Sequence, residues 1–188
     1  MTSPPGPLAG SVPAVPKPLL LAFDPVRRAQ ELWRRRWAAD DAMAAATSIM
    51  RVQQLLLARY DEALRTHGLT FARYEALVLL TFSRSGRLPL TKIGERLMVH
   101  PTSVTNTVQR LEQAGLVDRV PNPRDGRGTL AGVTAAGRAV VEAATKDLVA
   151  LDFGLEALDS DEREQLFALL RKVRLGAADF TDEEPLDS

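Results

Sequence analysis

The sequence contains no cysteine, only two histidines, and few aromatic residues, which make up 5% of its 188 positions. Without cysteine the chain forms no disulfide, offers no thiolate to zinc, and has no thiol with which to sense oxidants. The histidines, His67 and His100, are not clustered with each other as metal ligands usually are. We therefore expect no metal and no cofactor. The lack of disulfides is also compatible with a cytoplasmic location.

Long hydrophobic runs are missing as well. The longest run near the N-terminus, residues 19–23, is far shorter than the roughly 18 residues that a membrane span requires. Because prolines precede this run, we expect neither a membrane span nor a signal peptide. Residues 1–23 hold six of the twelve prolines and almost no charge, a composition that predicts a disordered leader.

The residue patterns that support catalysis are absent too. The sequence shows no nucleophile with a positioned base, no metal triad and no glycine-rich phosphate loop in its strand-to-helix context. The fragment Gly126-Arg127-Gly128 lacks both the strand before it and the helix after it. We expect no catalytic residue and no enzymatic activity.

The formal net charge is zero, but the charges are unevenly distributed. Residues 84–128 hold eight basic and four acidic side chains, whereas residues 140–188 hold five basic and thirteen acidic ones. A polyanion responds to the field within a Debye length, roughly 8–10 Å. The basic region is therefore a candidate DNA-binding face, with the acidic region directed away from it. Two solvated surfaces of opposite sign would explain the charges equally well.

Hydrophobic periodicity and capping residues predict a mainly α-helical chain of the α+β class. Helical segments are expected at 24–66, 70–83, 92–98, 102–114, 134–151 and 160–176, and strands at 88–90, 116–120 and 129–133. Asp24, Thr70, Thr91, Thr134 and Asp159 are the expected N-caps, and Gly68 and Gly115 the expected C-terminal glycines. We expect His67 to be a helix cap or a surface residue.

The first helical segment is apolar on more than one face, which predicts burial against a partner subunit. Its apolar residues are Ile49, Val52, Leu55, Leu56, Leu57, Tyr60, Ala63 and Leu64. Farther upstream, Trp33 and Trp37 are spaced i,i+4 around three arginines. We expect the two tryptophans to pack across a partner subunit as well. A ligand cage or a base-stacking platform is the alternative.

Two short helices separated by a tight turn, the second opened by Pro101, indicate a helix-turn-helix. In the second helix, Val104, Val108 and Leu111 share one face and should point into the core. The other face carries short hydrogen-bonding side chains, and Glu112 is the only acid of the helix. Such a face can approach the major groove closely, so the second helix is the candidate recognition helix.

Candidate DNA contacts follow from the chemistry of these side chains. Amides such as Asn106 and Gln109 can pair bidentately with adenine, and Arg110 can pair with guanine or hold a phosphate. The predicted major-groove set is Ser103, Thr105, Asn106, Gln109 and Arg110. The predicted phosphate set is Thr91, Lys92, Arg96 and Thr102. His100 is expected to cap the recognition helix or to contact a phosphate.

The hairpin that follows carries two arginines at its tip, between Asn122 and Gly128. Arginine on a narrow protrusion suits the negative potential of a narrow minor groove. Asn122, Arg124 and Arg127 are the predicted contacts of this hairpin with DNA. Arg124 and Asp125 could form a simple surface ion pair, but we favour a role for Asp125 or Asn122 in orienting the arginines.

These motifs, from Leu69 to Arg138, resemble the MarR family of bacterial transcription regulators. The matching stretches are Gly68-Leu69-Thr70, Ile93-Gly94-Glu95-Arg96-Leu97, residues 104–112, Gly115-Leu116-Val117, Pro123-Arg124-Asp125-Gly126-Arg127 and Val133-Thr134-Ala135-Ala136-Gly137-Arg138. The resemblance implies a homodimer that reads a pseudopalindromic operator in double-stranded DNA, usually as a repressor that a small ligand releases. A winged-helix module that binds protein instead of DNA is the alternative. It would place acids or bulky apolar groups on the outer face of residues 101–114, and the sequence shows neither.

The resemblance also implies a domain organisation. Residues 67–133 correspond to the winged helix-turn-helix lobe, residues 24–66 and 134–176 to the dimerisation helices, and residues 177–188 form an acidic tail. The sequence departs from the family pattern at two positions of the lobe. Asn122 stands where an acid usually opens the wing motif, and Asn106 stands where the recognition helix often has arginine, so the operator sequence cannot be taken from relatives.

Overall fold

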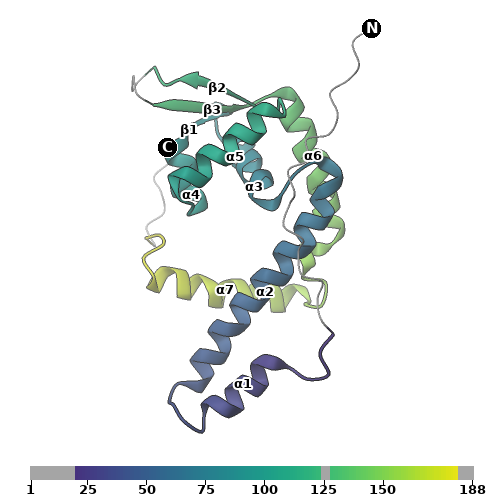
Figure 1. Cartoon of the computed structure of the whole chain (residues 1–188), viewed down its shortest axis with the longest axis vertical. Helices are drawn as coiled ribbons and strands as arrows, with labels where there is room; N and C mark the ends of the chain where they lie inside the picture. The colour runs from purple at the N-terminus through teal and green to yellow at the C-terminus, as the bar shows by residue number, and fades with distance from the viewer. Residues whose placement is uncertain (1–19, 124–127, 182–188) are drawn as a thin grey trace.

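The computed structural model describes residues 20–123 and 128–181. The chain is mainly helical and carries one small antiparallel sheet (Figure 1). In order, its elements are α1 (Pro25–Trp33), α2 (Asp40–Leu64), α3 (Phe71–Phe82), β1 (Arg87–Pro89), α4 (Leu90–Leu97), α5 (Pro101–Gln113), β2 (Val117–Pro121), β3 (Thr129–Val133), α6 (Ala135–Ala150) and α7 (Ser160–Gly176). Helix pair α4–α5 followed by the β2–β3 hairpin is the winged helix-turn-helix that the sequence predicts.

The sheet has the order β1-β3-β2, with both pairings antiparallel. The expected edge strand is therefore present as β1, one residue earlier than predicted. The hairpin register pairs Val117 with Val133 at its base and Pro121 with Thr129 toward its tip. Figure 1 shows β2 and β3 projecting past the end of α5, so the hairpin forms a wing beside that helix.

The core lies between α3, α5, α6 and the sheet. Val104, Val108 and Leu111 are 2%, 0% and 1% exposed, which confirms the predicted core face of the recognition helix. They pack in one cluster with residues from the other elements, among them Leu64, Leu77, Leu80, Ile93 and Leu148. This burial holds α5 in place with its opposite face outward.

The predicted continuous helix from residue 24 to 66 is wrong, because the chain breaks between α1 and α2. Ala39 has a left-handed φ of 54°, and the chain reverses so that α1 packs against α2 (Figure 1). Although α1 ends at Trp33, the Trp37 N–H still donates to the Trp33 carbonyl at 2.9 Å, so the predicted i,i+4 spacing of the two tryptophans is retained. Their rings lie together, with centroids 4.7 Å apart, and their packing across a partner subunit stays a prediction.

One predicted helix cap, Thr91, is wrong, and another, Thr70, occupies the N-cap position of α3 as predicted but without a side-chain bond. The Thr70 side chain makes no capping bond, since the Phe71 N–H instead donates to the Asp61 carboxylate at 2.7 Å. Helix α4 begins at Leu90, so Thr91 lies inside it. The other caps are confirmed: Asp24 and Thr134 accept backbone N–H groups, and Asp159 forms a capping box with Glu162. Gly68 and Gly115, at φ 69° and 72°, end their helices as expected.

The helices at the two ends of the described chain lie outside the core. Neither α1 nor α7 has a buried residue, and Figure 1 shows both at the end of the molecule away from the sheet. Exposed apolar side chains lie on α2 and α7: Ile49, Met50, Val52, Leu55, Leu57, Phe167, Leu169 and Val173. Within the described residues, no helix combines the length and the apolar character needed to cross a membrane.

Candidate nucleic-acid interface

Helix α5 begins at Pro101 because the residues at its start favour helix initiation there. Pro101 occupies the first turn, where its missing N–H costs no hydrogen bond. The His100 ring Nδ1 accepts from the Thr102 N–H at 3.3 Å, and the His100 carbonyl accepts from Ser103 and Val104. The capping role expected of His100 is thus confirmed, and the contact with a phosphate stays a prediction.

The outer face of α5 is exposed along its whole length. The exposed residues are Thr102, Ser103, Thr105, Asn106, Gln109, Arg110 and Gln113. The structure therefore brings the predicted major-groove residues together on one surface. The Thr105 hydroxyl donates to the Pro101 carbonyl at 3.0 Å, so its proton is used within the helix and only its oxygen is left to accept.

Glu112, the one acid on α5, is neutralised by an ion pair. Its carboxylate lies 2.6 Å from an Arg119 guanidinium nitrogen on β2, and each side chain is about one third exposed (36% and 33%). The pair removes a negative charge from the outer face and joins the recognition helix to the wing. Sequence reasoning missed this contact because α5 and β2 approach each other only after the chain turns at Gly115.

The predicted phosphate contacts of α4 lie beside α5. Thr91, Lys92 and Arg96 are all exposed. Lys92 pairs with Glu95 at 2.7 Å, with both side chains more than half exposed. Such a pair contributes less than about 1 kcal/mol, so a phosphate oxygen can displace the carboxylate. The α4 face therefore remains suited to a polyanion.

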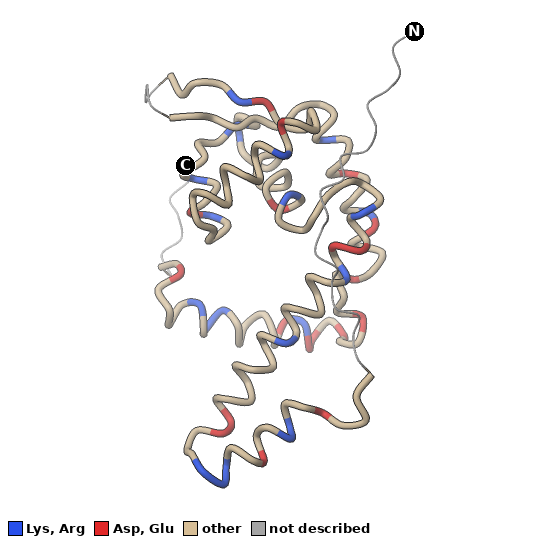
Figure 2. Tube along the Cα trace, in the orientation of Figure 1, with Lys and Arg blue, Asp and Glu red and all other residues tan. Residues whose placement is uncertain are grey.

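Three cations of residues 84–123 have no acidic partner within the described residues. The acids Glu95, Glu112 and Asp118 are each paired with a base, which leaves Arg84, Arg96 and Arg110 to supply the positive charge. In Figure 2 basic segments lie along β1, α4, α5 and β2, whereas acidic segments gather where α6 leads into α7. Arg84 was not among the predicted contacts.

A second ion pair stiffens the base of the wing. Arg87 on β1 and Asp118 on β2 both pair in register with Gly132 on the central strand. The Arg87 guanidinium reaches the Asp118 carboxylate at 2.6 Å by passing over Gly132. A Cβ at Gly132 would overlap Asp118 Oδ1 and lie 2.9 Å from Arg87 Cγ. Only glycine at this position leaves room for the pair.

The wing tip is only partly described. The Asn122 N–H donates to the Gly128 carbonyl at 2.9 Å, which closes the hairpin, and the Asn122 side chain is half-buried. Arg124, Asp125 and Arg127 lie outside the described residues. Their predicted contacts with the minor groove therefore stay predictions.

His67 makes an interaction that the sequence did not predict. Its Nε2 lies 2.6 Å from the Asp147 carboxylate on α6, and its side chain is 19% exposed. The contact spans 80 positions of sequence, so neither a helix cap nor a free surface residue describes it. It ties the turn after α2 to α6, remote from α5.

The chain resembles known regulators in both sequence and structure. Residues 67–128 match the model of the MarR family. The HTH-type transcriptional regulator MhqR of Bacillus subtilis is 31% identical over 121 residues, 64% of this chain and 82% of that protein. The crystal structure of Sco5413, a MarR family transcriptional regulator from Streptomyces coelicolor, is 63% identical and superposes with a TM-score of 0.71, covering 76% of this chain and 99% of that one.

One structural relative was solved together with DNA. Sco3205, a MarR family transcriptional regulator from Streptomyces coelicolor in complex with DNA, is 25% identical, with a TM-score of 0.68. The match covers 80% of this chain and 95% of that one. Sco3205 thus binds DNA with a fold similar to that of this chain.

Proposed function

The chain belongs to the MarR family of DNA-binding transcriptional regulators, and on that premise we propose that it is a homodimeric repressor of a pseudopalindromic operator. The observation that carries the proposal is the exposed face of α5, whose single acid is neutralised by Arg119. Amides, hydroxyls and an arginine on such a face match the donor and acceptor pattern of base edges in the major groove.

We infer that the candidate contacts fall into sets with different roles on DNA. Ser103, Thr105, Asn106, Gln109 and Arg110 would read base edges, while Thr91, Lys92, Arg96 and Thr102 hold phosphates. Phosphate contacts release counterions and supply much of the affinity and its salt dependence. Asn122, Arg124 and Arg127 of the wing would enter the flanking minor groove, where the negative potential is strongest.

The homodimer is supported by the apolar faces of α2 and α7. Phe167, Leu169 and Val173 are 60–62% exposed in the isolated chain, and a second copy of the same surfaces would cover them. Two copies bound to half-sites one turn of DNA apart would hold their α5 helices about 34–36 Å apart. Repression, and release by a small ligand, are the further expectations that family membership supports.

The test begins by selecting bound fragments from a random duplex library with the full chain. We expect the selection to enrich a sequence with two inverted half-sites. The substitution Asn106→Ala should then weaken binding to the selected operator by roughly 1–3 kcal/mol, about 5- to 150-fold, and relax the preference at one base pair per half-site. Affinities are compared at one fixed salt concentration.

Gln113→Ala provides the matched control, since Gln113 is an exposed amide at the far end of the same helix. It should leave the affinity for the operator unchanged. An equal loss on operator and random duplexes for Asn106→Ala would show that Asn106 does not read a base. Enrichment of no sequence at all would contradict the proposed function.

A further inference from the structure

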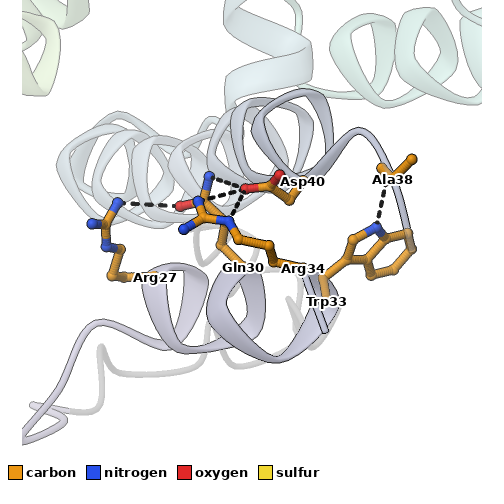
Figure 3. A network of polar contacts seen from close by, with 6 residues as sticks. All are labelled: Arg27, Gln30, Trp33, Arg34, Ala38 and Asp40. Carbon is orange, nitrogen blue, oxygen red and sulfur yellow. Dashed lines mark hydrogen bonds and ion pairs between the residues drawn. The ribbon is translucent and has the colours of Figure 1, made fainter. Parts of the chain in front are cut away.

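The turn between α1 and α2, residues 34–39, lies at the end of the molecule away from α5 and the wing (Figure 1). The Arg34 guanidinium donates to the Asp40 carboxylate from Nε at 3.0 Å and from Nη2 at 2.6 Å. Gln30 donates to the same oxygen at 3.2 Å. Figure 3 shows these side chains converging on Asp40. We call residues 34–39 the arginine turn.

The conformation of the arginine turn is held from both sides. The hydrogen bonds from Arg34 keep the pKa of Asp40 below its ordinary value, so this carboxylate stays charged at neutral pH. On the other side, the Trp33 indole N–H donates to the Ala38 carbonyl at 3.0 Å (Figure 3), and the Trp37 ring packs on Trp33. The turn thus presents its remaining side chains from a preformed backbone.

Those remaining side chains are two cations and an aromatic ring. Arg35 and Arg36 are exposed, and within the described residues neither has an acidic partner. Trp37 is 57% exposed. Two free guanidiniums beside an exposed indole make a surface suited to carboxylates next to an apolar or proline residue.

DNA is a poor candidate for this surface. Figure 1 shows the α1–α2 hairpin at the end of the molecule opposite to α5 and the wing. A duplex lying on α5 would be remote from the arginine turn, and Coulombic attraction fades beyond about 8–10 Å in physiological salt. The partner is therefore to be sought among acidic protein segments.

This chain itself contains a segment with the required chemistry. Residues 182–187 read Asp-Glu-Glu-Pro-Leu-Asp, four carboxylates with a proline and a leucine between them. We propose that the arginine turn is the docking site for residues 182–187 of a second copy of this chain. The carboxylates bind Arg35 and Arg36, and Pro185 and Leu186 cover the Trp37 ring. The inference rests on the homodimer proposed above.

The position of α7 favours the second copy over the same copy. The exposed apolar residues of α2, from Ile49 to Leu57, lie between the arginine turn and the buried end of that helix. If the partner's α7 covers them with its C-terminal end toward the arginine turn, the chain that leaves α7 emerges beside this turn. Residues 182–187 span up to about 20 Å when extended, which is enough to reach it.

Two of the basic residues of α7, Arg171 and Arg174, are engaged with the chain that follows them. Arg174 lies 3.7 Å from the Asp179 carboxylate, and the guanidiniums of Arg171 and Arg174 stack on the Phe180 ring at 5.0 and 5.4 Å. Within the described residues this leaves Lys172 as the cation at this end of α7 without an acidic partner, a single ammonium against the two guanidiniums of Arg35 and Arg36. The free guanidiniums of the arginine turn are the better partner.

The absence of cysteine from the chain allows a direct test by disulfide trapping. One full-length copy carries Ala38→Cys and a second, differing in mass by a tag, carries Ser188→Cys. Both substitutions leave the proposed contacts intact. The two copies are mixed, allowed to exchange subunits and mildly oxidised. We expect the disulfide between Ala38→Cys and Ser188→Cys to form about tenfold faster than the disulfide between the control Arg51→Cys and Ser188→Cys. Arg51 is an exposed arginine on the same helix, α2.

The role of the charges is tested by adding Arg35→Gln and Arg36→Gln to the Ala38→Cys copy. The rate advantage should disappear, while the unfolding midpoint and the affinity for the selected DNA stay unchanged. Equal rates for Ala38→Cys and Arg51→Cys, or a rate unaffected by the loss of both arginines, would overturn the inference. A chain that carries both cysteines, mixed with excess wild type, should not form a disulfide within one copy, and such a disulfide would also overturn the inference. Weaker DNA binding after the loss of both arginines would overturn it as well.

Sedimentation of the unmodified chain separates this inference from the proposed function. A chain that stays monomeric at micromolar concentration would contradict the proposed homodimer and this inference together. A dimer that shows no preferential trapping would overturn the docking site alone, and operator binding would still stand.

Discussion

At the scale of single residues, Gly132 shows how a missing side chain can organise a contact between two others. It lies on the central strand between Arg87 and Asp118, whose ion pair passes over it. That pair is more than a third exposed and by itself contributes less than about 1 kcal/mol. The larger effect of filling Gly132 is therefore steric, and it acts at the base of the wing.

The substitution Gly132→Ala should lower the free energy of unfolding by roughly 1–3 kcal/mol, because the new Cβ would overlap Asp118 Oδ1 and crowd Arg87. Urea denaturation measures this change. In the background Asp118→Ala the same substitution should cost much less, since the overlapped atom is gone. Gly176→Ala is the control, because a Cβ there meets nothing within 4 Å. A cost at Gly132 that is independent of residue 118 would contradict this account.

The sequence predicted the exposed face of α5 but not the ion pairs around it, for a physical reason. The outer face of α5, including Asn106 and Gln109, follows from helical periodicity within thirteen residues. The pairings of Glu112 with Arg119 and of Arg87 with Asp118 join different elements, and periodicity within one element says nothing about them. Which residues contact DNA stays a prediction.

At the scale of elements, a threonine at a helix start caps the helix only where no other side chain accepts the free backbone N–H groups. The Thr134 hydroxyl donates to the Gly115 carbonyl at 2.8 Å and accepts from the Gly137 N–H at 3.0 Å. It thereby joins the start of α6 to the end of α5. At Thr70 the free N–H of α3 is instead satisfied by Asp61 from α2, a contact that the local sequence does not reveal.

The substitution Thr134→Val should therefore lower the free energy of unfolding by about 1–2 kcal/mol, the usual contribution of a threonine cap. Thr134→Ser should retain most of it. Thr70→Val is the matched control and should change stability by less than about 0.5 kcal/mol, because its hydroxyl makes no capping bond. Thermal unfolding of the three variants checks this, and equal losses for both valine substitutions would contradict the assignment.

The break between α1 and α2 is the largest difference between the predicted and observed elements. Residues 24–66 have helical periodicity on both sides of the break, so the sequence predicted one helix. The ion pair between Arg34 and Asp40 and the bond from Trp33 to Ala38 stabilise a reversed chain instead. These are contacts between residues on the two sides of the turn, and they form only once α1 folds back.

At the scale of the whole molecule, the uncovered apolar faces make the isolated chain incomplete. Phe167 on α7 is 62% exposed, and an aromatic side chain buries roughly 150–250 Å² when it is covered. At about 25 cal/mol per Å² this is several kcal/mol per copy, and a twofold axis counts each residue twice. The stability of a dimer should depend strongly on such residues.

The substitution Phe167→Ser should thus weaken the dimer by about 100-fold or more in Kd, as measured by sedimentation over a range of concentrations. Operator binding should then require higher protein concentrations, since two copies must assemble on two half-sites. Phe82→Ser is the control: Phe82 is 83% exposed but belongs to the last turn of α3, which is not part of the proposed interface. If both substitutions weakened the dimer equally, or if neither weakened it, α7 would not be part of the dimer interface.

By itself, the sequence determined the winged helix-turn-helix, the two faces of α5 and the family, since each depends on spacing and capping within a few consecutive residues. Tertiary structure alone decided the reversal at the arginine turn, the pairing of Glu112 with Arg119, the contact of His67 with Asp147 and the passage of an ion pair over Gly132. Each of these joins residues from different elements. Their positions depend on how the elements pack, because a hydrogen bond or an ion pair forms only where packing brings its two ends within about 3 Å of each other.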